Sequence, residues 1–190
     1  MTAGALLDGV FPADIAVASS RVGDVPPELF PEEAALLAKA VEKRRREFAH
    51  GRACARRALA AHGAPAAPLL IGPAREPLWP PRFVGSITHD RELCVAVVAR
   101  ADTFAGLGVD VEPDEPLTPP VAARVWSPAE ASAALALGVV PEDSAAKLVF
   151  AAKEAVYKCQ FPLTRTFVGF HGVSVELATG SFTAALTAPV

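Results

Sequence analysis

The sequence predicts an α+β fold, mainly because of the order of its helical and strand-like stretches. A helical stretch is followed by strand-like runs, then by further helices, and then by two more strand-like runs. Of the 190 residues, 52% are hydrophobic and 21% are charged, which excludes intrinsic disorder as the main state. This length suffices for one ordinary domain or for two small packed halves.

The first half of the chain is expected to hold one long helix and two strands. Pro31 followed by two glutamates is typical of a helix N-terminus, and Gly63 predicts that this helix ends at about His62. Two strand-like runs follow, at residues 83–88 and 93–99.

The second half is expected to begin and end with strands. A strand-like run at residues 107–112 ends at Pro113, because proline cannot continue a strand ladder. Residues 113–120 are expected to form an extended connector. Residues 172–177 and 181–186 alternate weakly between apolar and polar side chains, which is typical of a hairpin.

Two helices are expected between these strands. Ser127 and Glu130 have the spacing of a capping box, so a helix should begin there and end at Gly138. A second helix is expected over residues 144–160, because Pro162 cannot continue it.

The charge distribution and the cysteines limit the class of protein. A net charge of −3 argues against a general nucleic-acid binder, although residues 39–57 alone carry +6. Three scattered cysteines give neither a disulfide framework nor a zinc site, which favours a reducing compartment. The longest uncharged run, residues 58–74, is interrupted by prolines, and the N-terminus lacks the basic residues of a signal peptide. We therefore expect a cytoplasmic protein with no membrane segment.

Asp110 and Glu112 are candidate ligands for a divalent cation. On a strand, residues two apart face the same side, so these carboxylates would lie together. Oxygen ligands of this kind suit Mg²⁺, especially beside phosphate oxygens. A solvated strand end is the alternative interpretation.

Glu154 and Lys158 lie four residues apart on a helix that is apolar nearly all round. Burying a charge is costly unless the charge is paired or used in the reaction, so Glu154 could complete a metal site or act as general base. Lys158 could hold a phosphate group. The alternative interpretation is a surface ion pair of little energetic consequence.

His89 and a group of arginines are candidate phosphate ligands. His89 stands at a strand end, where it could bind phosphate or shuttle protons, or simply serve the turn. Arg45, Arg52 and Arg56 share one helix face and Arg44 lies nearby, which is the arrangement of either a phosphate clamp or a solvated face. Together with the carboxylates, these groups indicate transfer from a phosphate ester or anhydride, without a P-loop or a dinucleotide-binding motif.

The chain resembles the 4′-phosphopantetheinyl transferases of the bacterial enterobactin-synthase-component type, over roughly residues 30 to 186. Six short motifs lie in the order of that family. They are RREF at 45–48 with GRACAR at 51–56, EPLWP at 76–80, GSITH at 85–89, GVDVE at 108–112, FAAKEAVYK at 150–158, and FPLT at 161–164 with GF at 169–170.

The resemblance implies Mg²⁺-dependent transfer of 4′-phosphopantetheine from coenzyme A (CoA) to a serine of an acyl or peptidyl carrier protein, releasing 3′,5′-ADP. It implies metal binding by Asp110, Glu112 and Glu154, with Glu154 also deprotonating the serine. Lys158 and His89 would stabilise the negative charge of the pyrophosphate during the transfer. The residues implied to contact CoA are Arg44, Arg52, Arg75, Thr88, His89, Lys153 and Lys158. Arg75 is the only base in a loop where relatives often carry a lysine.

The resemblance also implies two similar halves related by a pseudo-twofold axis, residues 1–105 and 106–190, with CoA in the cleft between them. Relatives usually continue past position 190, so the second half is expected to be shortened at its C-terminus. A monomer is expected. Phe161, Leu163 and Phe167 are candidates for carrier docking, with core packing as the alternative.

Two other functions remain open. A metal-dependent pyrophosphatase could use the same carboxylates with water as the nucleophile. An inactive module that binds CoA or a carrier protein is the third possibility, although the complete set of Asp110, Glu112, Glu154 and Lys158 argues against it. The sequence does not indicate whether the carrier serves fatty acid, polyketide or non-ribosomal peptide synthesis.

Overall fold

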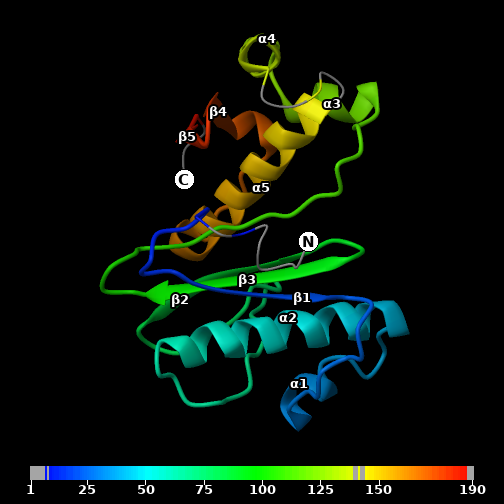
Figure 1. Cartoon of the computed structure of the whole chain (residues 1–190), viewed down its shortest axis with the longest axis vertical. Helices are drawn as coiled ribbons and strands as arrows, with labels where there is room; N and C mark the ends of the chain where they lie inside the picture. Colours follow the sequence, from blue (N-terminus) through cyan, green and yellow to red (C-terminus); the bar gives the residue numbers. More distant parts are fainter. Residues whose placement is uncertain (1–6, 8, 139–140, 142–143, 188–190) are drawn as a thin grey trace. The chain divides into compact units, whose positions relative to one another are not determined.

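The computed structural model describes residues 7, 9–138, 141 and 144–187, and it confirms an α+β chain with small sheets. The chain divides into two compact units, Met1–Val111 (unit 1) and Glu112–Val190 (unit 2). Figure 1 names their helices and strands. No helix among the described residues is long and apolar enough to span a membrane.

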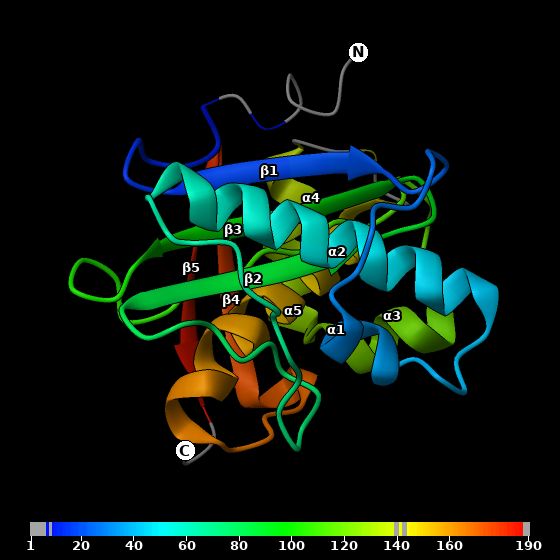
Figure 2. The ribbon, with the colours of Figure 1, turned by 90° about the horizontal axis from the view of Figure 1, so that it is seen from below.

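Unit 1 is a three-stranded antiparallel sheet with a long helix along one face. In chain order its elements are β1 Ala16–Arg21, α1 Pro31–Ala35, α2 Glu42–Ala61, β2 Phe83–His89 and β3 Leu93–Arg100. The strand order is β1-β3-β2, and Figure 2 shows α2 lying along this sheet. The two predicted strands are thus confirmed, whereas β1 was not predicted, because its alanines and serines give a weak strand pattern.

Strand β3 forms the centre of unit 1 because it is buried on both faces. Ala96 and Val98 pack with residues of α2, while Val95 and Val97 pack with Val109. This two-sided burial explains why the strand is apolar almost without interruption.

The segment 107–112 is not a strand, contrary to the prediction. Hydrogen bonds to two side chains of β2 fix this segment, and they take the part that a strand ladder would otherwise play. Val109 N–H donates to Ser86 Oγ (3.2 Å), and Val111 N–H donates to Thr88 Oγ1 (3.2 Å). The alternating apolar pattern therefore reflects packing on β3 rather than membership of the sheet.

The single helix predicted from Pro31 to His62 is also wrong, because α1 and α2 are separate helices. The Arg45 side chain of α2 donates to Ala40 O (2.9 Å) and Ala38 O (3.0 Å). These bonds satisfy carbonyl groups in the turn between the helices, where the helical ladder is interrupted.

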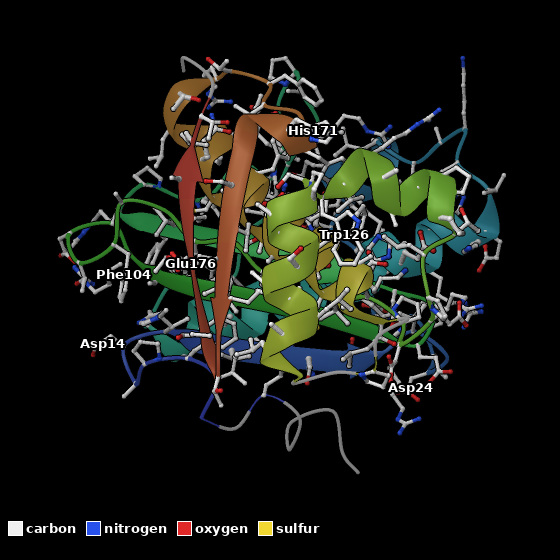
Figure 3. All side chains as sticks on the ribbon, turned by 90° about the horizontal axis from the view of Figure 1, so that it is seen from above. Asp14, Asp24, Phe104, Trp126, His171 and Glu176 are labelled. Carbon is white, nitrogen blue, oxygen red and sulfur yellow. The ribbon has the colours of Figure 1, made fainter. Side chains whose placement is uncertain are left out.

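Unit 2 packs three helices against a two-stranded hairpin. Its elements are α3 Pro119–Val125, α4 Pro128–Leu137, α5 Ala145–Thr164, the 3₁₀ helix η2 Phe170–Gly172, β4 Val173–Ala178 and β5 Ser181–Leu186. Figure 3 shows α4 beside β4. The core contains Val125, Ala134 and Val149.

The predicted capping box and hairpin of unit 2 are confirmed, and two other expectations are corrected. Glu130 N–H donates to Ser127 Oγ (3.2 Å), and Gly138 ends α4 in the left-handed conformation (φ 62°). Residues from Pro119 on are helical rather than extended, because proline also suits the first turn of a helix. Helix α5 includes Pro162, which lies in its last turn, and ends at Thr164. The expected shortening of the C-terminus concerns chain beyond position 190 and stays a prediction.

Candidate active site

In unit 1, the structure brings together two predicted phosphate ligands, Arg44 of α2 and His89 at the end of β2. Arg44 Nη1 lies 3.3 Å from His89 Nε2. The Glu47 carboxylate lies 3.9 Å from both groups, so a negative charge offsets part of the local positive charge. This pair can offer hydrogen-bond donors to an anion.

Arg52 is more buried than a solvated arginine, with only 5% of its surface exposed. Its Nε donates to Leu69 O (2.7 Å), and its guanidinium lies over the Phe48 ring, 4.1 Å from the centroid. Burial lowers the pKa of Arg52 to about 10 despite the neighbouring Glu33, so the side chain remains charged at neutral pH. A fixed buried cation of this kind suits a phosphate group.

Asp110 is oriented by Thr88, since the threonine hydroxyl donates to Asp110 Oδ1 (2.9 Å). The same hydroxyl accepts the Val111 amide, so Thr88 fixes both the backbone and the carboxylate of this segment. The carboxylate chemistry and its fixed orientation fit a hard divalent cation.

Arg75 stands on an exposed turn and has an unusual backbone conformation (φ 70°). Its N–H donates to Gly72 O (2.9 Å), and the following Glu76 accepts the amide of Ala74 (3.0 Å). Gly72 leaves room for this carboxylate, since an added Cβ would lie 2.3 Å from a Glu76 oxygen. The turn thus presents Arg75 to solvent.

In unit 2, Glu112 forms an ion pair with Lys147 of α5 (3.1 Å). Sequence reasoning missed Lys147, because its partner lies 35 residues away. Ser144, at the start of α5, also donates to Asp114 (3.0 Å). These two contacts hold the first turn of α5 to the acidic segment that opens unit 2.

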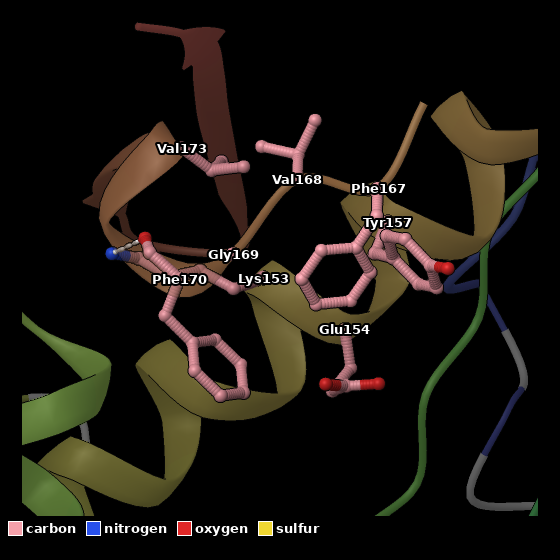
Figure 4. Close-up of a pocket in the computed structure, with 8 residues that line it drawn as sticks. All are labelled: Lys153, Glu154, Tyr157, Phe167, Val168, Gly169, Phe170 and Val173. Atoms are coloured by element: carbon pink, nitrogen blue, oxygen red, sulfur yellow. Dashed lines mark hydrogen bonds between the residues drawn. The ribbon is translucent and has the colours of Figure 1, made fainter. Parts of the chain in front are cut away.

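Glu154 and Tyr157 of α5 line a mostly apolar pocket that encloses about 150 Å³. Phe167 and Phe170 also line it, and Figure 4 shows the Glu154 side chain projecting from α5 among the residues of the pocket. Lys158 follows on the same helix. The pocket therefore combines a carboxylate with a mostly apolar wall.

Lys153 is buried (2% exposed) and makes three strong contacts inside unit 2. Its Nζ lies 2.9 Å from Val125 O, 2.8 Å from Phe170 O and 2.9 Å from Glu130 Oε1. Burial alone raises the pKa of Glu130, but hydrogen bonds from the Ser127 amide, Lys153 and the Val175 amide outweigh it, so the pKa lies below its ordinary value. This geometry favours a structural role for Lys153 over the predicted contact with CoA.

The predicted metal ligands are divided between the units: Asp110 belongs to unit 1, and Glu112 and Glu154 belong to unit 2. Within the described part of the chain, no group of three or more His, Cys, Asp or Glu side chains is placed to hold a metal ion. The joint metal site thus stays a prediction.

Comparison with known proteins gives matches in both units. The family model described as the 4′-phosphopantetheinyl transferase N-terminal domain matches residues 32–99, and that of the 4′-phosphopantetheinyl transferase superfamily matches residues 106–189.

Three relatives illustrate the similarity. The 4′-phosphopantetheinyl transferase PptT of Mycobacterium tuberculosis is 40% identical, over 95% of this chain and 81% of PptT. The 4′-phosphopantetheinyl transferase Svp of Streptomyces mobaraensis is 44% identical, over 85% of this chain and 67% of Svp. The enterobactin synthase component D of Salmonella typhimurium is 32% identical, over 76% of this chain and 60% of its own length.

Proposed function

This chain belongs to the 4′-phosphopantetheinyl transferase family and transfers phosphopantetheine to carrier proteins, and on that premise we propose the details of the reaction. The donor is CoA, the acceptor is a serine hydroxyl of an acyl or peptidyl carrier protein, and the second product is 3′,5′-ADP. The pocket beside Glu154 carries this proposal, because it places a carboxylate against a mostly apolar, aromatic wall.

In the proposed reaction, the serine oxygen forms a bond to the phosphorus that bears the pantetheine arm. The bond from that phosphorus to the bridging oxygen breaks, and its electron pair leaves on 3′,5′-ADP. Glu154 accepts the serine proton as general base. The aromatic wall of the pocket, formed by Tyr157, Phe167 and Phe170, binds the uncharged arm and excludes water from it.

The phosphates of CoA are proposed to bind to cations already fixed by the fold. Arg52, held by Leu69 O, and Arg44, in contact with His89, supply donors from α2 and β2. The other proposed ligands of the CoA phosphates are Thr88, Arg75 and Lys158.

Asp110, Glu112 and Glu154 are proposed to hold Mg²⁺. Their oxygen ligands fit this ion, and Thr88 keeps Asp110 oriented before any ion binds. When bound, the ion would neutralise charge on the pyrophosphate.

We also propose that the two halves are structurally similar, meet near residue 105 and form the CoA cleft between them. Support comes from the element order within each unit, where a helix that begins with proline precedes a helix of 20 residues and then an antiparallel hairpin. A cytoplasmic monomer is part of the same proposal. Leu163 (55% exposed) and Phe167 (77% exposed) are candidates for carrier docking, together with Phe161.

The test is intact mass spectrometry of several purified apo-carrier proteins, each incubated with the enzyme, CoA and Mg²⁺. We expect at least one carrier to gain the mass of one phosphopantetheine arm while an equal amount of 3′,5′-ADP is released. Loss of CoA with no gain by any carrier would instead indicate a pyrophosphatase. CoA binding with neither change would indicate an inactive binding module.

A further inference from the structure

Unit 2 contains a buried ion pair, Glu130 of α4 with Lys153 of α5, directly beside the proposed base Glu154. We infer that Glu130 is a positioning residue for the transfer reaction: acting through Lys153, it fixes the turn of α5 that carries Glu154. This inference rests on the proposed function. It assigns a role to Glu130, which the sequence indicates only as a helix cap.

Both the Lys153 ammonium and the Glu130 carboxylate form several further hydrogen bonds. The Lys153 ammonium can donate three hydrogen bonds, and it reaches Val125 O, Phe170 O and Glu130. The Glu130 carboxylate also accepts the amides of Ser127 (2.8 Å) and Val175 (2.9 Å). One point on α5 is thereby joined to the end of α3, the start of α4, η2 and β4.

These contacts bear on both walls of the pocket. Glu154 follows Lys153 on α5, and the carbonyl that Lys153 binds belongs to Phe170, whose residue also lines the pocket. A change in the pair would move the base and the opposite wall relative to each other. Such small displacements lower the catalytic rate strongly, since a misplacement of about 1 Å can reduce it on the order of 100-fold.

Stability alone does not account for such a pair, because a buried ion pair can often be replaced by apolar side chains of similar volume without loss of stability. A buried ion pair does, however, fix the positions of its neighbours, because all of its hydrogen bonds form together in only one arrangement. We therefore attribute its presence beside Glu154 to the placement of that carboxylate.

The test compares Glu130→Gln with the double variant Glu130→Gln/Lys153→Met in the full chain. Glutamine keeps oxygen and shape but removes the charge that Lys153 needs. The double variant removes both charges, so it should recover part of the thermal stability lost by the single variant. In both variants we expect kcat to fall about tenfold while the KM for CoA stays within about twofold. Hydrogen exchange at the Val175 amide should accelerate in both.

Ser127→Ala is the matched control, because it removes the cap at Glu130 N–H without touching the ion pair. It should lower the melting temperature and leave kcat unchanged. If kcat of the folded single variant equals that of wild type, or recovers along with stability in the double variant, Glu130 is only structural and the inference is wrong. If Glu130→Gln does not fold, the double variant alone decides by the same criterion. If the wild-type enzyme modifies no carrier, the proposed function fails and the inference fails with it.

Discussion

Glu33 in unit 1 and Glu130 in unit 2 are buried carboxylates of closely similar construction. Each is the third residue of a helix that begins with proline, and each accepts the backbone amide three residues earlier, Phe30 (3.0 Å) and Ser127 (2.8 Å). Each pairs with a cation 23 residues further along, on the 20-residue helix of its own unit. These cations are Arg56 and Lys153.

The two clusters differ in what lies beside them. Glu33 also accepts the amide of Leu69 (2.9 Å), whose carbonyl accepts Arg52, so the Glu33 cluster supports a proposed phosphate ligand. The Glu130 cluster instead lies next to Glu154 and the pocket. The comparison indicates that the same kind of buried carboxylate–cation pair supports phosphate binding in unit 1 and the proposed proton transfer in unit 2.

The largest expected effect is on stability, when the cation of either cluster is removed. Arg56→Met and Lys153→Met each leave a buried carboxylate without its charge partner, and each should lower the free energy of unfolding by about 3 kcal/mol. The carboxylates left behind are buried in both cases, since Glu33 is 0% and Glu130 is 8% exposed. Urea denaturation measures the loss, and hydrogen exchange should place it in α2 for one variant and in α5 for the other. A loss that spreads over both units in either variant would contradict the comparison.

The next effect separates binding from turnover. Arg52→Ala should raise the KM for CoA about tenfold with little change in kcat, because a charge-assisted contact that we propose to the 3′-phosphate of CoA is lost. Steady-state kinetics with 3′-dephospho-CoA in the same variant provide the control, since a purely structural defect would affect both donors alike. An unchanged KM for CoA would remove Arg52 from the proposed phosphate site.

Acid sensitivity should distinguish Glu130 from its neutral replacement. The pKa of Glu130 lies below its ordinary value of 4.5 in the folded chain, so its carboxylate contributes stability above that value, which is lost as the pH falls through the lowered pKa. Glu130→Gln should therefore lose less stability than wild type when the pH is lowered below 4.5. Thermal unfolding at a series of pH values measures this; parallel curves for the two proteins would show that Glu130 contributes no such dependence.

The smallest expected effect concerns the glycines that follow the helices of each unit. Gly63 (φ 76°) and Gly138 (φ 62°) both adopt the left-handed conformation, and no neighbour would obstruct an added methyl group. Alanine at either position should thus cost about 1 kcal/mol through backbone strain alone. Melting temperatures should fall by similar amounts in the two variants, with kcat unaffected.

Local patterns predicted much of this fold, because capping, turn and strand signals act within a few residues. The capping box at Ser127 and the strands over 83–88 and 93–99 are examples. Patterns failed where distant residues compete with local preference, as at 107–112, where hydroxyls of β2 replace a strand ladder.

The same limit applies to the site. The motif residues could be named from the sequence, and the structure does bring Arg44 to His89 and Thr88 to Asp110. The partners that fix them could not be named: Leu69 for Arg52, Lys147 for Glu112 and Glu130 for Lys153. Each of these contacts spans at least 17 residues and depends on tertiary packing.

The central claim is that Glu154 performs the proton transfer while arginines of unit 1 bind phosphates of the donor, and Glu154→Gln tests it most directly. Calorimetry should show that the variant still binds CoA appreciably, whereas intact mass spectrometry should show no modified carrier under conditions in which wild type converts it fully. Carrier modification by Glu154→Gln at the wild-type rate would contradict the account.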